Sequence, residues 1–166
     1  MRLDPQGLTN GILAGLVCIT ASSDSVDSWS AILIGIIGSL TYSYSVKICN
    51  HFQVDDPLEA FQVHGCCGFT GLISLAFFKK DHGILYSYKS FQDEDGNKVV
   101  AGFELLLVQF LGSLIIIIWS GSISTIFFLI SRRMGTLRMS VQEEILGGDI
   151  FYFGPIKFQG KLQEYD

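Results

Sequence analysis

Apolar residues run without interruption by charge through four long stretches of the chain. These stretches lie at about residues 5–23, 28–46, 60–78 and 105–131. A transmembrane helix needs about 20 apolar residues to cross a hydrocarbon core ~30 Å thick, so each stretch is long enough for one helix. The pattern therefore predicts an all-α membrane protein with four transmembrane helices. Their expected bounds are about 8–22, 28–47, 57–78 and 103–131, in a transmembrane domain of residues 1–133.

The composition supports a membrane protein and excludes several other classes. The 166 residues are 49% hydrophobic and only 16% charged, which is too apolar for the watery surface of a soluble domain. The net charge of −5 leaves no basic stripe to neutralise phosphates, so nucleic acid is not an expected partner. The sequence contains no nucleophile with an adjacent base, no HExxH and no phosphate-binding loop, which argues against an enzyme.

The four cysteines predict packing rather than chemistry. They are Cys18, Cys49, Cys66 and Cys67, and none has the spacing of zinc ligands. The adjacent pair would point in different directions on a helix, so a mutual disulfide is not expected. We therefore interpret all four as small packing residues and expect neither a metal nor another cofactor.

The first predicted helix carries glycines at intervals of four residues. Gly7, Gly11 and Gly15 would form a smooth groove along one face, and such a groove lets another helix approach closely. We therefore expect a close helix contact at Gly11 and Gly15. Asp4 and Pro5 precede this helix, whose apolar run is not Leu-rich, so we expect no cleavable signal peptide.

The third predicted helix opens with a clear N-terminal signal and contains a histidine. Asp56 can cap the helix, Pro57 suits the first helical position, and Glu59 would lie near the positive end of the helix dipole. With a start at Asp56 and a rise of 1.5 Å per residue, His64 would lie about 12 Å into the bilayer.

His64 allows two interpretations. In one, it is a structural histidine satisfied by a neighbouring serine, threonine or carbonyl group. In the other, it has a function, which we favour because ionisable groups are costly inside a membrane and typically mark a pathway or a relay. Burial disfavours the charged ring, so we expect a neutral imidazole that faces the bundle interior and offers one donor and one acceptor. Such a ring can bind a small neutral solute or hand on a proton.

A polar loop and an arginine-rich end flank the fourth predicted helix. Asp95 and Gly96 predict a tight turn in the loop at residues 79–102. The helix is longer than a perpendicular span requires, so we expect tilt or a protruding end. Three arginines in "SRRMGTLR" place its end in the cytoplasm, although Lys79 and Lys80 on the outer side oppose this orientation.

This orientation fixes the expected side of every loop. With four spans, the N-terminus and the 47–56 loop lie inside, whereas the 23–27 turn and the 79–102 loop lie outside. Residues 134–166 form a cytoplasmic carboxy-terminal tail.

The tail is predicted to contain one short helix. Ser140 and Glu143 form a capping-box pattern, and the helix would end at Gly147–Gly148. Apolar residues around this helix would otherwise be exposed to water. We therefore expect the tail to dock on the cytoplasmic face of the protein, in contact with loops such as residues 47–56. The candidate regulatory residues of the tail are Gly135, Glu143 and Asp149.

Three motifs together resemble a known family. They are "NGILAGLVCIT", "DDPLEAFQVHGCCG" and "LRMSVQEEILGGDI". They are similar to the final helices and tail of the ammonium transporter family, the Amt/Mep/Rh group, and most closely to its Amt branch. The resemblance extends over most of the chain and is interrupted mainly at residues 84–101.

The resemblance implies that the four helices correspond to the last four of an eleven-helix transporter built from two inverted halves. It also implies a homotrimer in the lipid bilayer, with one pore per subunit through which ammonium crosses as ammonia. His64 matches one of two paired pore histidines, and Asp56 matches the family's acid at the cytoplasmic end of the same helix. The implied location is the plasma membrane, with the tail in the cytoplasm.

The chain departs from the family pattern in two respects. It begins near the eighth family helix, so the first pore histidine, the outer aromatic recruitment site and the aromatic gate have no counterpart in it. Phe151 stands where plant-type tails have a threonine followed by "RHG", so control by phosphorylation at that position is not expected.

Two functions are compatible with this pattern. The first is ammonium transport by the carboxy-terminal part of a transporter, either an incomplete gene product or a half that needs its amino-terminal complement. The second is a non-conducting regulatory or dominant-negative subunit that binds full-length transporters. Expressed alone, the chain is expected to insert into the membrane without taking up ammonium.

Overall fold

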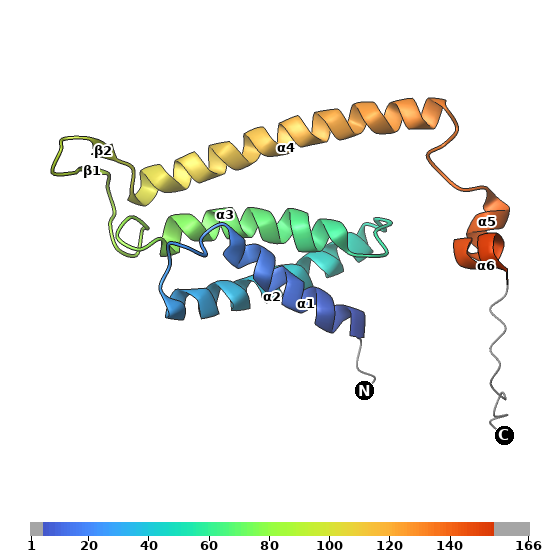
Figure 1. Cartoon of the computed structure of the whole chain (residues 1–166), viewed down its shortest axis with the longest axis horizontal. Helices are drawn as coiled ribbons and strands as arrows, with labels where there is room; N and C mark the ends of the chain where they lie inside the picture. Colours follow the sequence, from blue (N-terminus) through green and yellow to red (C-terminus); the bar gives the residue numbers. More distant parts are fainter. Residues whose placement is uncertain (1–4, 155–166) are drawn as a thin grey trace, which may run out of the picture. The chain divides into compact units, whose positions relative to one another are not determined.

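The computed structural model describes residues 5–154, which are mostly helical (Figure 1). The helices are α1 (Pro5–Thr20), α2 (Ser28–His51), the π-helix η1 (Phe61–Cys66), α3 (Cys67–Phe78), α4 (Gly102–Arg133), α5 (Val141–Leu146) and α6 (Gly148–Phe153). Two short strands, β1 (Phe91–Gln92) and β2 (Lys98–Val99), pair antiparallel in the loop that precedes α4. The chain divides into two compact units between Ile117 and Ile118, within α4.

Three helical segments among the described residues are long and apolar enough to cross a membrane. They are Ser28–His51 with 24 residues, Phe61–Phe78 with 18 and Gly102–Arg133 with 32. The first predicted span is also helical, but α1 has 16 residues and measures about 24 Å, which is shorter than a typical hydrocarbon core. Three of the four predicted spans are therefore confirmed as long apolar helices, and a membrane crossing by α1 stays a prediction.

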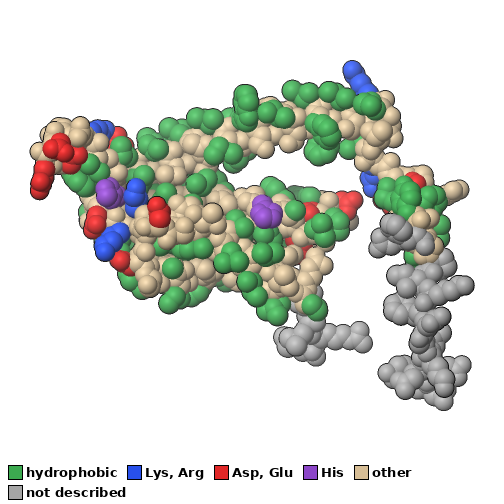
Figure 2. All heavy atoms as spheres, in the orientation of Figure 1, with side chains coloured by type: hydrophobic (Ala, Val, Ile, Leu, Met, Phe, Trp, Pro, Cys, Tyr) green, Lys and Arg blue, Asp and Glu red, His purple; other side chains and the backbone are tan. Residues whose placement is uncertain are grey.

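The surface of α4 is apolar along most of its length. Hydrophobic side chains are spread along the length of this helix in Figure 2, and only 6% of its most apolar 18-residue stretch is buried within the described residues. In water such a surface would be unstable, whereas lipid or other apolar helices would solvate it. The small buried fraction of α4 therefore agrees with the prediction of a membrane protein.

The third helix begins later than predicted. Its first helical segment, η1, starts at Phe61 rather than next to Asp56, because Glu59 adopts φ 57°. A residue in the left-handed region cannot continue a right-handed helix, and the amide of Glu59 instead closes a turn by donating to the carbonyl of Asp56 at 3.1 Å. Asp56 still caps the helix, because its carboxylate accepts from the amides of Ala60 (3.1 Å) and Phe61 (2.8 Å).

Helices α1, α2 and the η1–α3 segment pack around a small core. Its buried residues are Ala14, Cys18, Ile34, Tyr42, Val63 and Cys67. Two glycines mark tight crossings. A β-carbon at Gly38 would lie 2.9 Å from the sulfur of Cys18, and one at Gly71 would lie 2.5 Å from the Cys18 carbonyl oxygen. Any larger residue at these two positions would push α1 away from its neighbours.

Of the two glycines at which a close helix contact is predicted, Gly15 lies against the backbone of Gly35 in α2, and the contact at Gly11 stays a prediction. A β-carbon at Gly11 would have no described atom within 4 Å, and one at Gly15 would lie at an ordinary van der Waals distance, 3.8 Å, from the carbonyl oxygen of Gly35. Glycine spacing shows which face of a helix can be approached, but it does not show which face its neighbours meet. Among the described residues, the side chains that α1 buries are those of Ala14 and Cys18.

The cysteines are packing residues, as the sequence predicted. All four thiols are free, and Cys18, Cys49 and Cys67 are buried. The Cys18 thiol donates to the carbonyl of Cys67 at 3.0 Å, and the Cys67 thiol donates to the carbonyl of Gly38 at 3.5 Å. These two weak bonds connect α1, α2 and α3 at the centre of their packing.

The loop that follows α3 is anchored to the turn between α1 and α2. The Lys80 amide donates to the carbonyl of Ser25 at 2.8 Å, and the Lys80 ammonium pairs with Asp27 at 3.6 Å. The Tyr86 hydroxyl donates to Asp27 at 2.8 Å, and this bond to a carboxylate raises the pKa of Tyr86. The two segments that the sequence predicts on one side of the membrane therefore do lie together.

The turn predicted at Asp95 and Gly96 forms the tip of the β1–β2 hairpin. Gly96 has φ 80°, in the left-handed region that glycine adopts without strain. The Asp93 carboxylate accepts from the amides of Asn97 (2.7 Å) and Asp95 (3.1 Å). These bonds, chiefly the one from Asn97, lower the pKa of Asp93.

The second unit contains the end of α4 and two short helices. The predicted capping box opens α5: the Glu143 amide donates to the Ser140 hydroxyl at 3.3 Å, and the Ser140 amide donates to the Glu143 carboxylate at 2.6 Å. α5 ends at Gly147, with φ 80°, but Gly148 begins α6, a second helix that the sequence pattern did not predict. The remainder of the predicted tail, residues 155–166, lies outside the described residues.

Candidate functional site

His64 lies in the middle of η1, the π-helical turn that opens the third long helix. π-Helical turns are rare and are found frequently at functional sites. Because η1 starts at Phe61, His64 lies about 4.5 Å along the helix axis from its start, instead of the ~12 Å expected from a start at Asp56. The expected helix start, and with it the distance of His64 from that start, is therefore corrected, whereas the depth of His64 in a membrane stays a prediction.

The His64 ring is exposed within the described chain. Helices α1, α2 and α3 therefore do not cover the ring, and the expectation that it faces the interior of a complete bundle stays a prediction. The preceding residues Gln62 and Val63 face that packing and are 2% and 3% exposed, whereas His64 lies on another face of the turn. No hydrogen bond within residues 5–154 involves the ring. Both its donor and its acceptor nitrogen remain available to another group.

A phenyl ring covers the backbone beside the histidine. Gly65 follows His64, and a β-carbon at Gly65 would lie 2.9 Å from the ring of Phe61. A larger residue would therefore displace the Phe61 ring, which packs one turn before it.

Asp56 fixes the start of η1 and also binds a buried amide. In the orientation that satisfies both polar ends of its side chain, Gln62 donates to an Asp56 carboxylate oxygen at 2.6 Å and to the carbonyl of Glu59 at 3.2 Å. Because Gln62 is almost completely buried, leaving its amide unpaired would be costly. Asp56 therefore caps the helix and holds the residue that lies two positions before His64.

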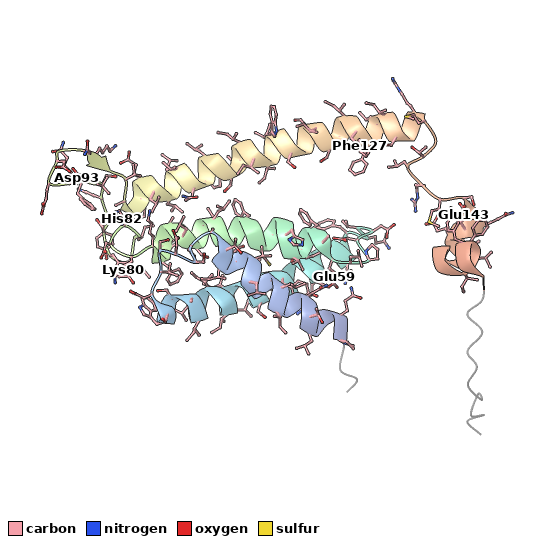
Figure 3. All side chains as sticks on the ribbon, in the orientation of Figure 1. Glu59, Lys80, His82, Asp93, Phe127 and Glu143 are labelled. Carbon is pink, nitrogen blue, oxygen red and sulfur yellow. The ribbon has the colours of Figure 1, made fainter. Side chains whose placement is uncertain are left out.

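Glu59 joins three segments at the start of η1 (Figure 3). Its carboxylate accepts hydrogen bonds from the Tyr42 hydroxyl of α2 and from the Asn10 amide of α1, the latter at 2.8 Å. The Asn10 amide also donates to the carbonyl of Leu58 at 3.3 Å. The sequence indicated only a dipole interaction for Glu59. Its two partners, 17 and 49 positions away, have no local sequence signal that pairs them with it.

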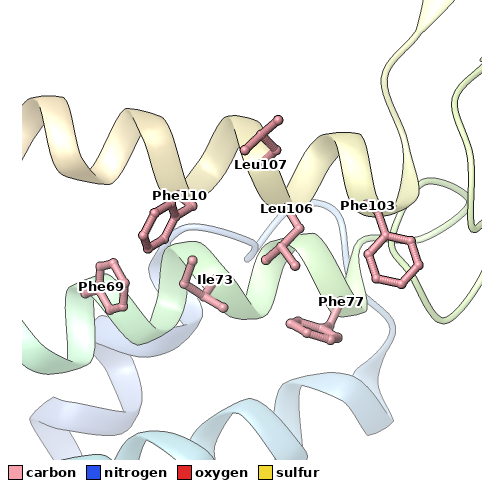
Figure 4. Close-up of a pocket in the computed structure, with 7 residues that line it drawn as sticks. All are labelled: Phe69, Ile73, Phe77, Phe103, Leu106, Leu107 and Phe110. Carbon is pink, nitrogen blue, oxygen red and sulfur yellow. The ribbon is translucent and has the colours of Figure 1, made fainter.

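A cavity of about 580 Å³ lies between α3 and the first half of α4 (Figure 4). It is lined by Phe69, Ile73, Phe77, Phe103, Leu106, Leu107 and Phe110. The rings of Phe69 and Phe110 lie edge to face, with centroids 6.4 Å apart. This lining has no charged side chain, so the cavity suits an apolar side chain or an acyl chain and not a small cation. Within residues 5–154, no cluster of His, Cys, Asp or Glu could hold a metal ion.

The candidate residues of the tail lie in the second unit. Gly135 follows α4 with φ 71°. The Glu143 carboxylate accepts from the Ser140 amide and from the Tyr152 hydroxyl at 2.9 Å. These bonds, chiefly the one from Ser140, lower the pKa of Glu143. Asp149 belongs to α6, and its side chain lies outside the described part of the structure.

The chain is similar to known proteins over nearly its whole length. The profile of the Ammonium Transporter Family matches residues 1–158. Ammonium transporter 1 member 3 from Solanum lycopersicum is 33% identical over 97% of this chain, and Ammonium transporter 3 from Dictyostelium discoideum is 37% identical over 84% of it. The chain covers 36% and 32% of these two relatives, so it spans about a third of their length.

A solved structure shows the same likeness. The crystal structure of a Mep2 mutant from Candida albicans matches with a TM-score of 0.64 and 26% sequence identity. The match covers 89% of this chain and 32% of that chain. The two proteins therefore share the arrangement of most of the helices described above.

Proposed function

Because the chain belongs to the ammonium transporter family, we propose that it is the carboxy-terminal part of an ammonium transporter subunit. In this proposal, His64 is one of two histidines that line the pore of the subunit. The other histidine belongs to the inverted half of the transporter that these residues do not include.

The observation that carries this proposal is the position of His64. The ring lies on a membrane-length apolar helix of 18 residues, where an ionisable group is costly and therefore typically marks a functional site. Helices α1 and α2 pack against the side of this helix that buries Gln62 and Val63, so they leave the His64 ring uncovered. The remaining two thirds of a transporter of the relatives' length would supply the opposite wall of a pore.

The chemistry of a neutral imidazole explains how such a pore would select its solute. An ammonium ion loses its hydration in a narrow apolar passage, and that loss is costly for a charge. Ammonia carries no charge, and the ring can donate a hydrogen bond to its nitrogen or accept one from it. We therefore propose that ammonium gives up its proton before or within the pore and crosses beside His64 as ammonia.

The architecture of the complete subunit is part of the same proposal. The four helices α1, α2, η1–α3 and α4 would correspond to the last four of eleven transmembrane helices in an inverted-repeat transporter. The subunits would form a homotrimer in the plasma membrane, or assemble with a complementary amino-terminal half. Arg132 and Arg133 in the last turn of α4 support a cytoplasmic tail, because basic residues are enriched on that side.

A chimeric transporter tests the role of His64. Residues 1–158 would replace the matching third of a full-length relative, expressed in cells that lack ammonium uptake. The change His64→Ala should leave its partner poorly satisfied in the pore, at a cost of about 1–3 kcal/mol. This corresponds to about 5–150-fold in transport rate, or to an equally clear change in ion selectivity.

His51→Ala is the matched control, because His51 is an exposed residue at the end of α2 whose ring contacts Phe52. This variant should transport like the unmodified chimera. A His64→Ala chimera with unaltered rate and selectivity would show that His64 does not line the pore. A chimera that reaches the membrane, conducts nothing and lowers uptake by a co-expressed relative would instead support a non-conducting subunit.

A further inference from the structure

Glu59 connects the first two helices to the turn that carries His64. Its carboxylate accepts hydrogen bonds from Asn10 of α1 and from Tyr42 of α2. Tyr42 is 6% exposed and belongs to the core, so its hydroxyl is a fixed anchor. Hydrogen bonds to a carboxylate are stronger than those between neutral groups, which makes this connection firm.

The backbone of Glu59 transmits this connection to the histidine. Its carbonyl oxygen accepts from the amide of Val63 at 3.0 Å and from the side chain of Gln62 at 3.2 Å. Both donors are almost completely buried, and Val63 directly precedes His64. Because the buried side of the turn is held in this way, the direction in which the Cα–Cβ bond of His64 leaves the backbone is restricted as well.

The conformation of Glu59 indicates that its surroundings constrain it. The residue has φ 57°, a region that the β-carbon makes unfavourable for residues other than glycine. Glycine would adopt this conformation without strain but could not bond to α1 and α2. Strained residues of this kind persist where surrounding contacts hold them, and they cluster at functional sites.

We propose that Glu59 is a positioning residue for His64. Its hydrogen bonds hold α1 and α2 against the start of η1, fix the π-helical turn and thereby set the direction in which the imidazole points. This inference rests on the proposed role of His64 in the pore. Glu59 acts through His64, and no contact between Glu59 and the transported species is needed.

Three variants distinguish the effect of the hydrogen bonds of the Glu59 carboxylate from the effect of its backbone conformation. Glu59→Gly keeps the left-handed conformation accessible but removes both side-chain bonds. Glu59→Gln keeps the length of the side chain and a carbonyl oxygen that still accepts from Tyr42. Tyr42→Phe keeps the ring in the core and removes only the hydroxyl donor. Glu94→Gly, in the exposed hairpin loop, is the matched control for loss of a glutamate.

The first measurement is the nitrogen NMR signal of the His64 ring. The chimera described above would be labelled at histidine nitrogen, and the signals of His64 and His82 would be assigned from their loss in single His→Gln variants. Glu59→Gly and Tyr42→Phe should shift the His64 signal, whereas Glu59→Gln should shift it less and Glu94→Gly should leave it in place. The His82 signal should not move in any variant, since that residue lies in the distant loop after α3 (Figure 3).

The second measurement is ammonium uptake by the same variants. Glu59→Gly should lower uptake by about tenfold or more, because small displacements of a positioned group have effects of this size. Glu59→Gln should recover most of the loss. Glutamine is neutral but can still accept hydrogen bonds, so recovery of uptake in Glu59→Gln would distinguish positioning through hydrogen bonds from a need for negative charge.

Several results would overturn the inference. An unshifted His64 signal in Glu59→Gly contradicts it, whatever happens to uptake. If Glu59→Gly also moves the His82 signal and so disturbs the whole unit, Tyr42→Phe decides, and an unshifted His64 signal in that variant contradicts the inference. If His64→Ala leaves uptake unaltered, the pore role fails, while the ring signal still decides whether Glu59 positions His64.

Discussion

Replacing Gly71 in α3 with alanine should separate α3 from α1. The new β-carbon would lie 2.5 Å from the carbonyl oxygen of Cys18, well inside the 3.4 Å at which ordinary contact begins. The obstructing atom belongs to the backbone of α1, so no side-chain rotation can relieve the overlap. The two helices must move apart, and the contacts of buried Cys18 and Cys67 would be loosened with them.

A matched control, Gly11→Ala, isolates the destabilisation that the overlap at Gly71 causes. Adding a methyl group to a close-packed site costs about 1–3 kcal/mol, while alanine is intrinsically favoured over glycine in a helix by about 1 kcal/mol. Gly11→Ala gains the same helix preference without any overlap, because no described atom lies within 4 Å of its β-carbon. The free energies of unfolding of the two variants should therefore differ by about 1–3 kcal/mol, with Gly71→Ala the less stable.

Thermal unfolding of the purified chain in one lipid or detergent mixture would measure this difference. The helical signal in circular dichroism should be lost at a lower temperature for Gly71→Ala, by about 2–4 °C for each kcal/mol. Equal unfolding temperatures for Gly71→Ala and Gly11→Ala would refute the close crossing of α1 and α3 at Gly71.

Three further predictions concern the loops and the tail. Ser140→Ala removes the hydroxyl of the capping box and should weaken α5 by about 1 kcal/mol, seen as faster amide hydrogen exchange in residues 141–146. The pKa of Glu143 is lowered by its bond from the Ser140 amide, so its contribution to α5 is present above the usual pKa of a glutamate. That contribution should disappear as the pH falls through the lowered value, as followed by the same exchange. The pKa of Tyr86 is raised by its bond to Asp27, so that contribution is present below the usual tyrosine pKa and is lost as the pH rises through the raised value. Tyr86→Phe should abolish this alkaline change in the exchange of residues 23–27, and an unchanged profile would count against the bond.

The long apolar helices follow from the sequence because their signal is local. The stretch that became α2 contains enough apolar residues to predict a membrane-length helix, whatever packs against it. The tail cap at Ser140 and the hairpin turn at Gly96 are also local, since each depends on residues only a few positions apart. These features could be predicted without knowledge of the fold.

The start of the third helix could not be predicted in the same way. Pro57 and Glu59 fit the first turn of a helix by composition. Glu59 nevertheless adopts a left-handed conformation beside bonds to Asn10 and Tyr42. These partners are distant in sequence, so no local pattern contains the competing interaction. The same limit applies to the glycine contacts. Gly38 and Gly71 pack closely against α1, and the face of α1 that they meet is known only from the structure.

The candidate site shows the same division between local and distant information. The motif around His64 is local, and it indicated the family to which the chain belongs. The exposure of the ring could not be read from that motif, because it follows from the packing of Gln62 and Val63 against α1 and α2 on another face of the π-helical turn. The packed helices leave the His64 ring exposed, so its place in a pore stays a proposal that depends on parts of a transporter outside the described residues.

Ammonium uptake by a chimeric transporter decides whether these residues act as part of a transport subunit. The chimera is a full-length relative in which residues 1–158 replace the matching segment, expressed in cells without ammonium uptake of their own. We predict that it restores uptake, whereas the relative truncated before that segment and the 166-residue chain alone do not. A chimera that reaches the membrane at the level of the intact relative and takes up no ammonium would contradict this function, as would uptake by the chain alone.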